Sequence, residues 1–134
     1  MQVKRIKVTK RDYRGYITDI LAKEIIEYIT IISSVAGAER GQHYHKATYQ
    51  YVYILKGKIK MLARMPGGKV VSRILEPGDL SLTVPMERHA MIALDNSLFL
   101  VFTRGPRGGK DYESDTYRLS KPLRGRSSST NHKI

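Results

Sequence analysis

Three of the four histidines lie at positions that could bring their imidazoles together. His43 and His45 are separated by one residue, and alternate residues of an extended chain point to the same face. Gln50 follows at the start of the next strand-like run, and His89 follows a proline-containing turn. Imidazole nitrogens with one side-chain oxygen suit a divalent ion such as Zn, Mn, Ni, Fe or Cu. A second interpretation fits these residues equally well, namely histidines that are only hydrogen-bonded in a polar barrel mouth.

Short runs with the composition of β-strands surround these residues on both sides. The runs are rich in β-branched and aromatic side chains, and turn signals such as 65–68 and 76–79 separate them. Residues 21–26 fit either one helical turn or a connection. The runs cover 3–9, 16–20, 27–35, 49–55, 58–64, 69–76, 79–84, 88–94 and 97–103. They predict an all-β, single-domain fold in which short antiparallel strands form a sandwich or barrel.

Positive charge is concentrated at both ends of the chain. The 134 residues carry a net charge of +12. Residues 1–11 and 118–134 each hold five basic and no acidic residues, so the region between them is nearly neutral. The last segment contains Pro, Gly and three consecutive Ser, which is typical of a disordered tail. We therefore expect a barrel over residues 1–117, including the N-terminal strands, and a basic, disordered tail over residues 118–134.

Several classes of function are disfavoured by what the sequence lacks. Without cysteine, the chain can form no disulfide, thiolate nucleophile or Cys-ligated zinc site. No apolar run approaches the ~18 residues of a membrane span, and the first residues lack the apolar stretch of a signal peptide. Zinc-finger spacing and Gly-aromatic RNA-binding signatures are also missing. We expect a cytoplasmic protein with a small-molecule substrate, no membrane association and no dedicated nucleic-acid partner.

The spacing around the histidine pair resembles the first motif of the cupin superfamily. Gly37 is followed by five residues, His43-x-His45, four residues, Gln50, six residues and Gly57. The family motif has the same glycines and H-x-H pair, with Glu at the position of Gln50.

The second cupin motif is matched less completely. Gly78 and His89 keep the interval of the motif, but Pro85 is displaced by one position and Ala93 stands where the motif has Asn. Together the two motifs span residues 37–93. The resemblance implies a single-domain cupin, which is a double-stranded β-helix or jelly-roll barrel.

The same resemblance implies that His43, His45 and His89 are metal ligands, together with Gln50. Because Gln offers a neutral carbonyl oxygen where the family carries an anion, a bound ion would be more positive and a better Lewis acid. The alternative is that Gln50 no longer binds, and that the metal is lost or held by the histidines alone.

Three phrases resemble the cupins that act on nucleotide-linked sugars, dTDP-4-keto-6-deoxyhexose 3,5-epimerases and related ketoisomerases. They are RDYRGYITDI (11–20), ERGQHYHK (39–46) and KDYESDTYRL (110–119). The resemblance implies an isomerase or epimerase that moves a proton beside a sugar carbonyl. His43 or His45 would be the base in a metal-free enzyme, and both would otherwise be ligands. Arg40 would face a sugar hydroxyl or a phosphate, or else would be a surface or inter-strand arginine.

Two other classes of function fit the same residues. An iron- or copper-dependent dioxygenase uses such a ligand set with open coordination positions. A non-enzymatic cupin would bind a carbohydrate or a metal without turnover. Because many small cupins pair through N-terminal strands, the resemblance also implies a homodimer. Within the strands, Tyr51 and Tyr53 alternate away from Gln50, whereas Met91 shares the face of His89 and should line the pocket.

Overall fold

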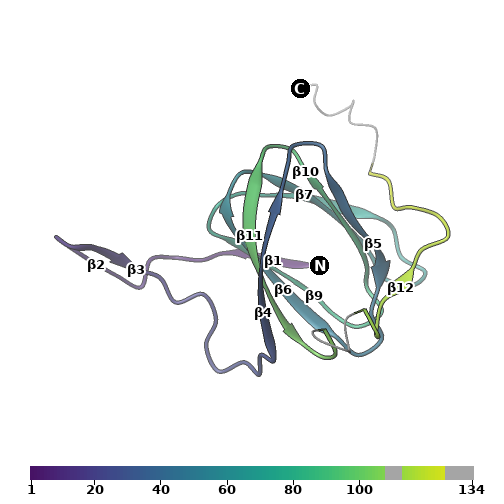
Figure 1. Ribbon diagram of the computed structural model, residues 1–134, viewed down its shortest axis with the longest axis horizontal. Coiled ribbons are helices and arrows are strands. Elements are labelled where there is room, and N and C mark those ends of the chain that lie inside the picture. Colours follow the sequence, from purple (N-terminus) through teal and green to yellow (C-terminus); the bar gives the residue numbers. More distant parts are fainter. Residues whose placement is uncertain (108–112, 126–134) are drawn as a thin grey trace.

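Two antiparallel sheets form the body of the molecule in the computed structural model, which describes residues 1–107 and 113–125 (Figure 1). The described residues contain no helix, so the predicted all-β fold is confirmed. In order across the first sheet lie β1 (Gln2–Arg5), β9 (Asp79–Thr83), β6 (Tyr49–Lys56), β11 (Ser97–Arg104) and β4 (Tyr28–Ser34). In order across the second lie β12 (Tyr117–Arg118), β5 (Glu39–Tyr44), β10 (Arg88–Ala93), β7 (Ile59–Arg64) and β8 (Val71–Leu75).

The apolar core lies between the two sheets and follows the alternation of the strands. In β6, the buried residues are Gln50, Val52 and Ile54, while Tyr51 and Tyr53 lie on the other face, as the sequence predicts. The inward positions of both sheets form one buried cluster. Its members are Val52, Ile54, Ile59, Met61, Leu75, Met91, Ala93, Phe99 and Val101. Because Gln50 heads the inward row of β6, it belongs to the interior and not to the surface.

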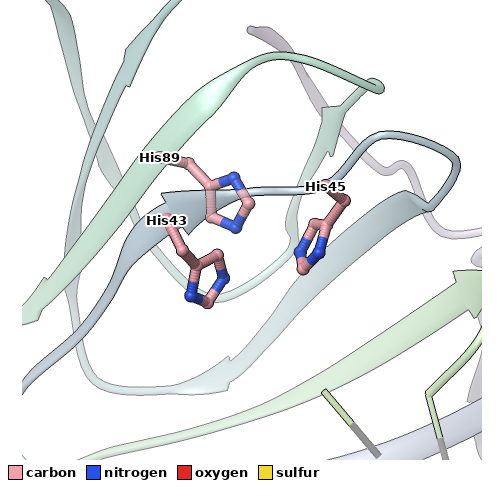
Figure 2. A group of neighbouring side chains, drawn as sticks. All are labelled: His43, His45 and His89. Atoms are coloured by element: carbon pink, nitrogen blue, oxygen red, sulfur yellow. The ribbon is translucent and has the colours of Figure 1, made fainter. Parts of the chain in front are cut away.

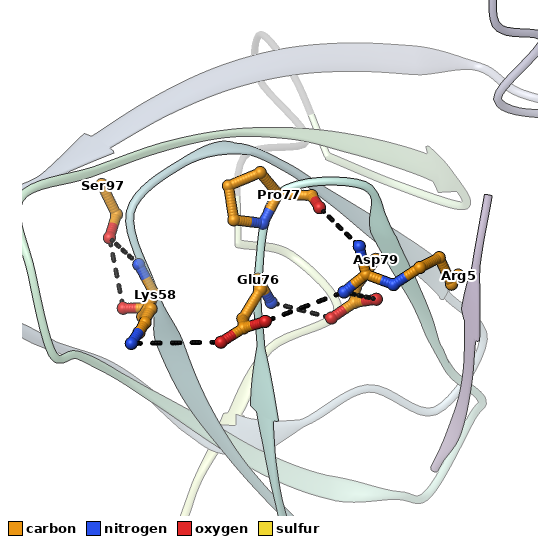
Figure 3. A network of polar contacts seen from close by, with 6 residues as sticks. All are labelled: Arg5, Lys58, Glu76, Pro77, Asp79 and Ser97. Atoms are coloured by element: carbon orange, nitrogen blue, oxygen red, sulfur yellow. Dashed lines mark hydrogen bonds and ion pairs between the residues drawn. The ribbon is translucent and has the colours of Figure 1, made fainter. Parts of the chain in front are cut away.

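One end of the barrel, formed by residues 56–58, 76–79 and 95–97, is closed by tight turns and is here named the closed end. Gly57 has φ +86°, and a Cβ there would lie 2.5 Å from the carbonyl oxygen of Asn96, so only glycine fits this turn. The buried Asp79 accepts a hydrogen bond from the Glu76 amide at 2.8 Å and an ion pair from Arg5 at 3.1 Å. Figure 3 shows these contacts as one network that closes this end.

A short hairpin projects from the body of the molecule. It consists of β2 (Lys10–Asp12) and β3 (Gly15–Ile17), which pair with each other, and Figure 1 shows it away from the barrel. Every residue of both strands is exposed. Among the described residues, no helix has the length and hydropathy that a membrane crossing requires.

The C-terminal part of the chain differs from the sequence-based expectation of a disordered tail beginning at residue 118. Residues 117–118 form β12, which pairs with β5, and Leu123 is only 4 % exposed. Leu123 packs against Leu62 and Ala90 on the outside of the second sheet. A single large apolar side chain therefore docks a segment whose composition is otherwise that of a tail. The rest of the expected tail, residues 126–134, lies outside the described residues.

Candidate functional site

A bulge in β5 brings two of the histidines to the end of the barrel opposite the closed end. Gly41 has φ +91° and Gln42 has φ +60°, and the register between β5 and β10 shifts at this point. A Cβ on Gly41 would lie 3.0 Å from the carbonyl oxygen of His89, so glycine permits the close approach of β10. The bulge leaves His43 directly opposite His89 in the ladder.

The three imidazoles form one cluster inside this end of the barrel (Figure 2). Their ring centroids lie 4.6 Å apart for His43 and His89, 4.8 Å for His43 and His45, and 5.2 Å for His45 and His89. One ring nitrogen from each lies within 4.8 Å of the other two. The predicted convergence of His43, His45 and His89 is therefore what the structure contains.

Two of the rings are anchored through one nitrogen and leave the other unpaired. The Nδ1 of His45 donates to the carbonyl oxygen of Asp115 at 2.8 Å, and the Nδ1 of His89 donates to that of Glu87 at 3.2 Å. Since a carbonyl oxygen can only accept, each Nδ1 carries a proton, and in the neutral form of each ring the Nε2 then carries a lone pair. Both Nε2 atoms are buried and have no hydrogen-bond partner among the described residues. Such nitrogens are costly to bury unless something binds them.

Two of the three imidazoles, those of His43 and His89, have lowered pKa values. Burial, together with the neighbouring His45, lowers the pKa of His89 to about 4. Burial, the other two histidines and the nearby Arg118 and Arg107 lower the pKa of His43 to about 3. At neutral pH both rings are unprotonated, so their lone pairs are available to a ligand without competition from a proton.

A cavity of about 370 Å³ opens at the histidines. Gln50 and Met91 lie in its wall, as the sequence predicts. Ile32 and Val101 supply further apolar wall. Charged residues also line the cavity, namely Glu39, Arg40, Arg107, Glu113 and Arg118. The site thus combines neutral nitrogen acceptors in its depth with guanidinium groups, which suit an anionic or polyhydroxylated ligand.

Arg40 lies in the cavity wall but its guanidinium is engaged elsewhere. Its Nε donates to the Ser34 hydroxyl at 2.8 Å, and its Nη2 donates to the Ser33 carbonyl at 2.9 Å. These bonds join β5 to β4, the edge strand of the opposite sheet. The inter-strand arginine that the sequence left open as an alternative is therefore the arrangement in the structure.

Residues 113–118 also belong to the site, although the sequence did not predict it. The Nη1 of Arg118 approaches the Nδ1 of His43 at 3.5 Å, and its Nη2 pairs with Glu113 at 2.7 Å. The carbonyl of Asp115 anchors His45. The phrase KDYESDTYRL, noted for its resemblance to nucleotide-sugar cupins, was the available signal.

Comparisons with known proteins identify the fold. No protein-family model and no curated protein sequence matches the chain. A double mutant of the QdtA 3,4-ketoisomerase from Thermoanaerobacterium thermosaccharolyticum, in complex with TDP, is 26% identical with a TM-score of 0.70, over 87% of this chain and 86% of that chain. A single-site mutant of the same enzyme, in complex with TDP-4-keto-6-deoxyglucose, is 22% identical with a TM-score of 0.72, again over 87% and 86%.

A third similar structure belongs to the other enzyme group that the sequence resembles. It is dTDP-4-dehydrorhamnose 3,5-epimerase from Sulfolobus tokodaii, 20% identical with a TM-score of 0.71, over 85% of this chain and 73% of that chain. The chain therefore has the RmlC-like cupin fold, and its structural neighbours are dTDP-sugar 3,5-epimerases and 3,4-ketoisomerases.

Proposed function

We propose that this protein, with the fold of those enzymes, is an isomerase or epimerase that moves a proton next to the carbonyl of a nucleotide-linked sugar. The observation that carries the proposal is the pair of buried, unpaired Nε2 lone pairs of His45 and His89 at the cavity. A neutral imidazole with its other nitrogen fixed on a carbonyl is the arrangement that a general base requires. The structural neighbours that hold TDP or a TDP-sugar supply the substrate class.

The reaction needs only proton transfers within the site. A base removes the C–H proton beside the ketone, and the electron pair of that bond forms the C–C double bond of an enolate. Return of a proton to the same carbon from the other face gives an epimer, whereas proton transfers through the enediol move the carbonyl to the neighbouring carbon. We assign the base to His45, because its Nε2 faces the cluster and its ring is held by the strongly anchored Asp115. The apolar Ile32, Met91 and Val101 limit water at the reacting carbon.

The arginine residues in the cavity wall suit the diphosphate of a nucleotide-linked sugar. Arg118 and Arg107 lie in the wall with His43, and guanidinium groups pair well with diphosphate oxygens. Gln50, buried among the apolar residues, offers both a donor and an acceptor for a sugar hydroxyl.

Deuterium exchange tests this function directly. The protein is incubated with TDP-4-keto-6-deoxyglucose in D₂O, and the sugar is followed by NMR and mass spectrometry. We expect deuterium beside the carbonyl and an isomer or epimer as product, with at least ~100-fold slower exchange for His45→Gln. Lys58→Gln at the closed end is the control and should exchange at the wild-type rate. If neither this sugar nor a panel of other nucleotide-sugars exchanges deuterium or raises the melting temperature, the proposed function is wrong.

As an alternative to the metal-free enzyme, we propose that His43, His45 and His89, with Gln50 close by, hold a divalent ion, in which case His45 is a ligand and not the base. The fit rests on the two orphaned Nε2 atoms and on the carbonyl anchors of both rings, because metal-ligating histidines commonly donate their second nitrogen in this way. An ion bound there would supply Lewis-acid stabilisation of an oxygen that gains negative charge. One ring nitrogen of each histidine lies within 4.8 Å of the other two, so the three residues would hold such an ion together.

Metal analysis of the protein purified without a histidine tag checks this second proposal. Wild type should bind one equivalent of Zn²⁺, Mn²⁺, Ni²⁺, Fe²⁺ or Cu²⁺ in calorimetric titrations, and His43→Ala and His89→Ala should each lose most of the affinity. Unchanged metal content in both variants would mean that the ligand assignment is incorrect. Bound iron or copper with oxygen uptake on substrate addition would replace the isomerase by the dioxygenase alternative, and binding of nucleotide-sugar without exchange would replace it by a binding protein.

We also propose that the protein is a homodimer. On the exposed face of the edge strand β4, Ile29 and Ile31 are 69% and 61% exposed, and the projecting β2–β3 hairpin exposes Tyr16 and Ile17. An isolated two-stranded hairpin is only marginally stable in water, so a second copy that covers it would stabilise it. Light scattering should give twice the monomer mass for wild type and a lower mass for Ile31→Lys. A monomeric wild type at high protein concentration would contradict the proposal.

A further inference from the structure

A segment of the chain distant in sequence from the histidines runs along β5, the strand that carries His43. Residues 113–125, here named the C-terminal strap, lie beside β5 in Figure 1. Within the strap, β12 pairs Tyr117 with Tyr44 and Arg118 with His43. The strap is therefore a direct neighbour of the strand that presents the site.

Asp115 of the strap holds the turn that follows His45. Its carboxylate accepts the amides of Lys46 at 3.0 Å and Ala47 at 2.9 Å, and the hydroxyl of Thr48 at 2.8 Å. Partial burial by itself raises the pKa of this carboxyl, but these three bonds and the nearby His45 outweigh it and lower the pKa below its usual value. The side chain is thus a charged cap for the turn, and residues 46–48 are fixed relative to Asp115.

The main chain of the same residue contacts the histidine itself. The carbonyl oxygen of Asp115 accepts the Nδ1–H of His45 at 2.8 Å. Because the carboxylate fixes the turn that directly follows His45, it also limits the distance between this carbonyl and the His45 ring. One residue therefore sets both the backbone position and the ring orientation of His45.

The other half of the strap holds the bulge before His43. Gln42, in a left-handed conformation at φ +60°, accepts the Leu119 amide on its carbonyl at 2.9 Å. Its side-chain oxygen accepts the Leu123 amide at 2.6 Å, and its side-chain amide donates to the Leu123 carbonyl at 3.3 Å. Burial of Leu123 against the second sheet keeps these hydrogen bonds between Gln42 and the strap in place.

We propose that Asp115 is a positioning residue that selects the Nδ1–H tautomer of His45, so that the Nε2 lone pair faces the cavity. A free imidazole favours the opposite tautomer, with the proton on Nε2, and that form would point a donor where the site needs an acceptor. The proposal rests on the proposed function only in that His45 Nε2 is the atom used there. The tautomer itself can be measured without substrate.

The test measures tautomer and turnover in the same set of full-length variants. The Nδ1 and Nε2 shifts of ¹⁵N-labelled histidine are recorded at pH 8 without metal, and His45 is assigned from His45→Gln. Wild type should show His45 protonated on Nδ1. Asp115→Ala should shift His45 toward the Nε2–H form, and Asp115→Asn, which loses an acceptor, should do so in part. In Asp115→Ala, the kcat of deuterium exchange should fall by about 10–100-fold, as is common for residues that orient an imidazole. The KM should change less than ~3-fold.

Two controls separate positioning from stability. Asp79, 8% exposed against 7% for Asp115, also holds a turn with its carboxylate, but at the closed end. Asp79→Ala should lower stability and leave the His45 tautomer and kcat unchanged. Thr48→Val removes one bond to Asp115 but keeps the carbonyl contact, so it should behave like Asp79→Ala. If His45 keeps the Nδ1–H form in Asp115→Asn and in folded Asp115→Ala, the proposal is wrong. A wild type with the expected tautomer but no exchange would instead overturn the proposed function alone.

Discussion

At each end of the barrel a buried aspartate holds a turn, Asp79 at the closed end and Asp115 at the end with the cavity. At the closed end, the polar side chains drawn in Figure 3 are paired: Arg5 with Asp79, Lys58 with Glu76, and Ser97 with the main chain of Lys58. At the cavity end, the equivalent cap holds a ring whose Nε2 is buried without a partner among the described residues. At both ends an aspartate carboxylate caps a turn. At the closed end this cap stabilises the fold, whereas at the cavity end it also positions a ring whose Nε2 can bind a ligand.

This contrast indicates that the cavity end, and not the closed end, lowers the stability of the folded protein. Buried polar groups without partners and buried neutral imidazoles oppose folding, while a ligand that satisfies them recovers the cost. The cavity end should therefore be sensitive to pH and ligand, and the closed end should be insensitive to both. The following variants test that contrast.

The largest expected effect is the loss of the anchor of the C-terminal strap. Leu123 is 4% exposed and packs on Leu62 and Ala90, so Leu123→Ala should lower the free energy of unfolding by about 3 kcal/mol. Urea denaturation measures the change. The same variant should also slow deuterium exchange, because the strap carries Asp115. A loss below about 1 kcal/mol would show that the strap is not bound as described.

The pH dependence of stability should be of similar size and should belong to the cavity end. The pKa of His89 is lowered from 6.5 to about 4 in the folded protein, so the unfolded chain binds a proton first as pH falls. The contribution of His89 to stability is full above pH 6.5 and falls by about 1.4 kcal/mol per pH unit down to about pH 4, roughly 3 kcal/mol in total, and the lowered pKa of His43 acts in the same direction.

Urea titrations at pH 7.5, 5.5 and 4.5 measure this slope. His89→Gln should remove this part of the slope and leave the part that the lowered pKa of His43 contributes, whereas Lys58→Gln at the closed end should keep the whole slope. Saturating metal should steepen the dependence, since protons and the ion compete for the same nitrogens. An identical slope in wild type and His89→Gln would remove His89 as its source.

A smaller effect is expected for the cap of the closed end. Asp79→Ala leaves the Glu76 amide without its acceptor and removes the ion pair with Arg5, which should cost about 1–2 kcal/mol. Turnover and metal affinity should stay within about twofold of wild type, the outcome that separates the two ends. A large loss of activity in this variant would mean that the ends are coupled.

The smallest effect is expected for the exposed part of the same network. Lys58 and Glu76 are both about half exposed and their charged atoms are 3.9 Å apart. Such pairs contribute little, so Lys58→Gln should change the free energy of unfolding by less than about 0.5 kcal/mol. A change above about 1 kcal/mol, removed by 1 M NaCl, would show that the network is cooperative.

The sequence predicted the barrel and the histidine cluster because both follow from short-range rules. Alternation in β6 places Gln50 inward and Tyr51 outward, and the i, i+2 spacing puts His43 and His45 on one side of the chain. The interval between Gly78 and His89, which matches the second cupin motif, then predicted that His89 joins them. These inferences need only strand periodicity and a known order of motifs.

The missing parts depend on contacts that no periodic pattern encodes. The bond between His45 and Asp115 joins residues 70 positions apart, and the Gln42–Leu123 bonds join residues 81 apart. The composition of residues 118–125 is that of a disordered tail. A single buried apolar residue, Leu123, nevertheless docks this segment on the second sheet, and composition does not reveal such a contact. The engagement of Arg40 with Ser33 and Ser34 depends on the packing of β5 beside β4, which only the assembled sheets define.

The position of Asp115 after all three histidines in the sequence has a consequence for synthesis. A ribosome synthesises His43, His45 and His89 well before Asp115 and Leu123, so the barrel strands can pair while the site still lacks its anchor. During synthesis, the strands that carry the three histidines can therefore pair before the site has its anchor in the C-terminal strap.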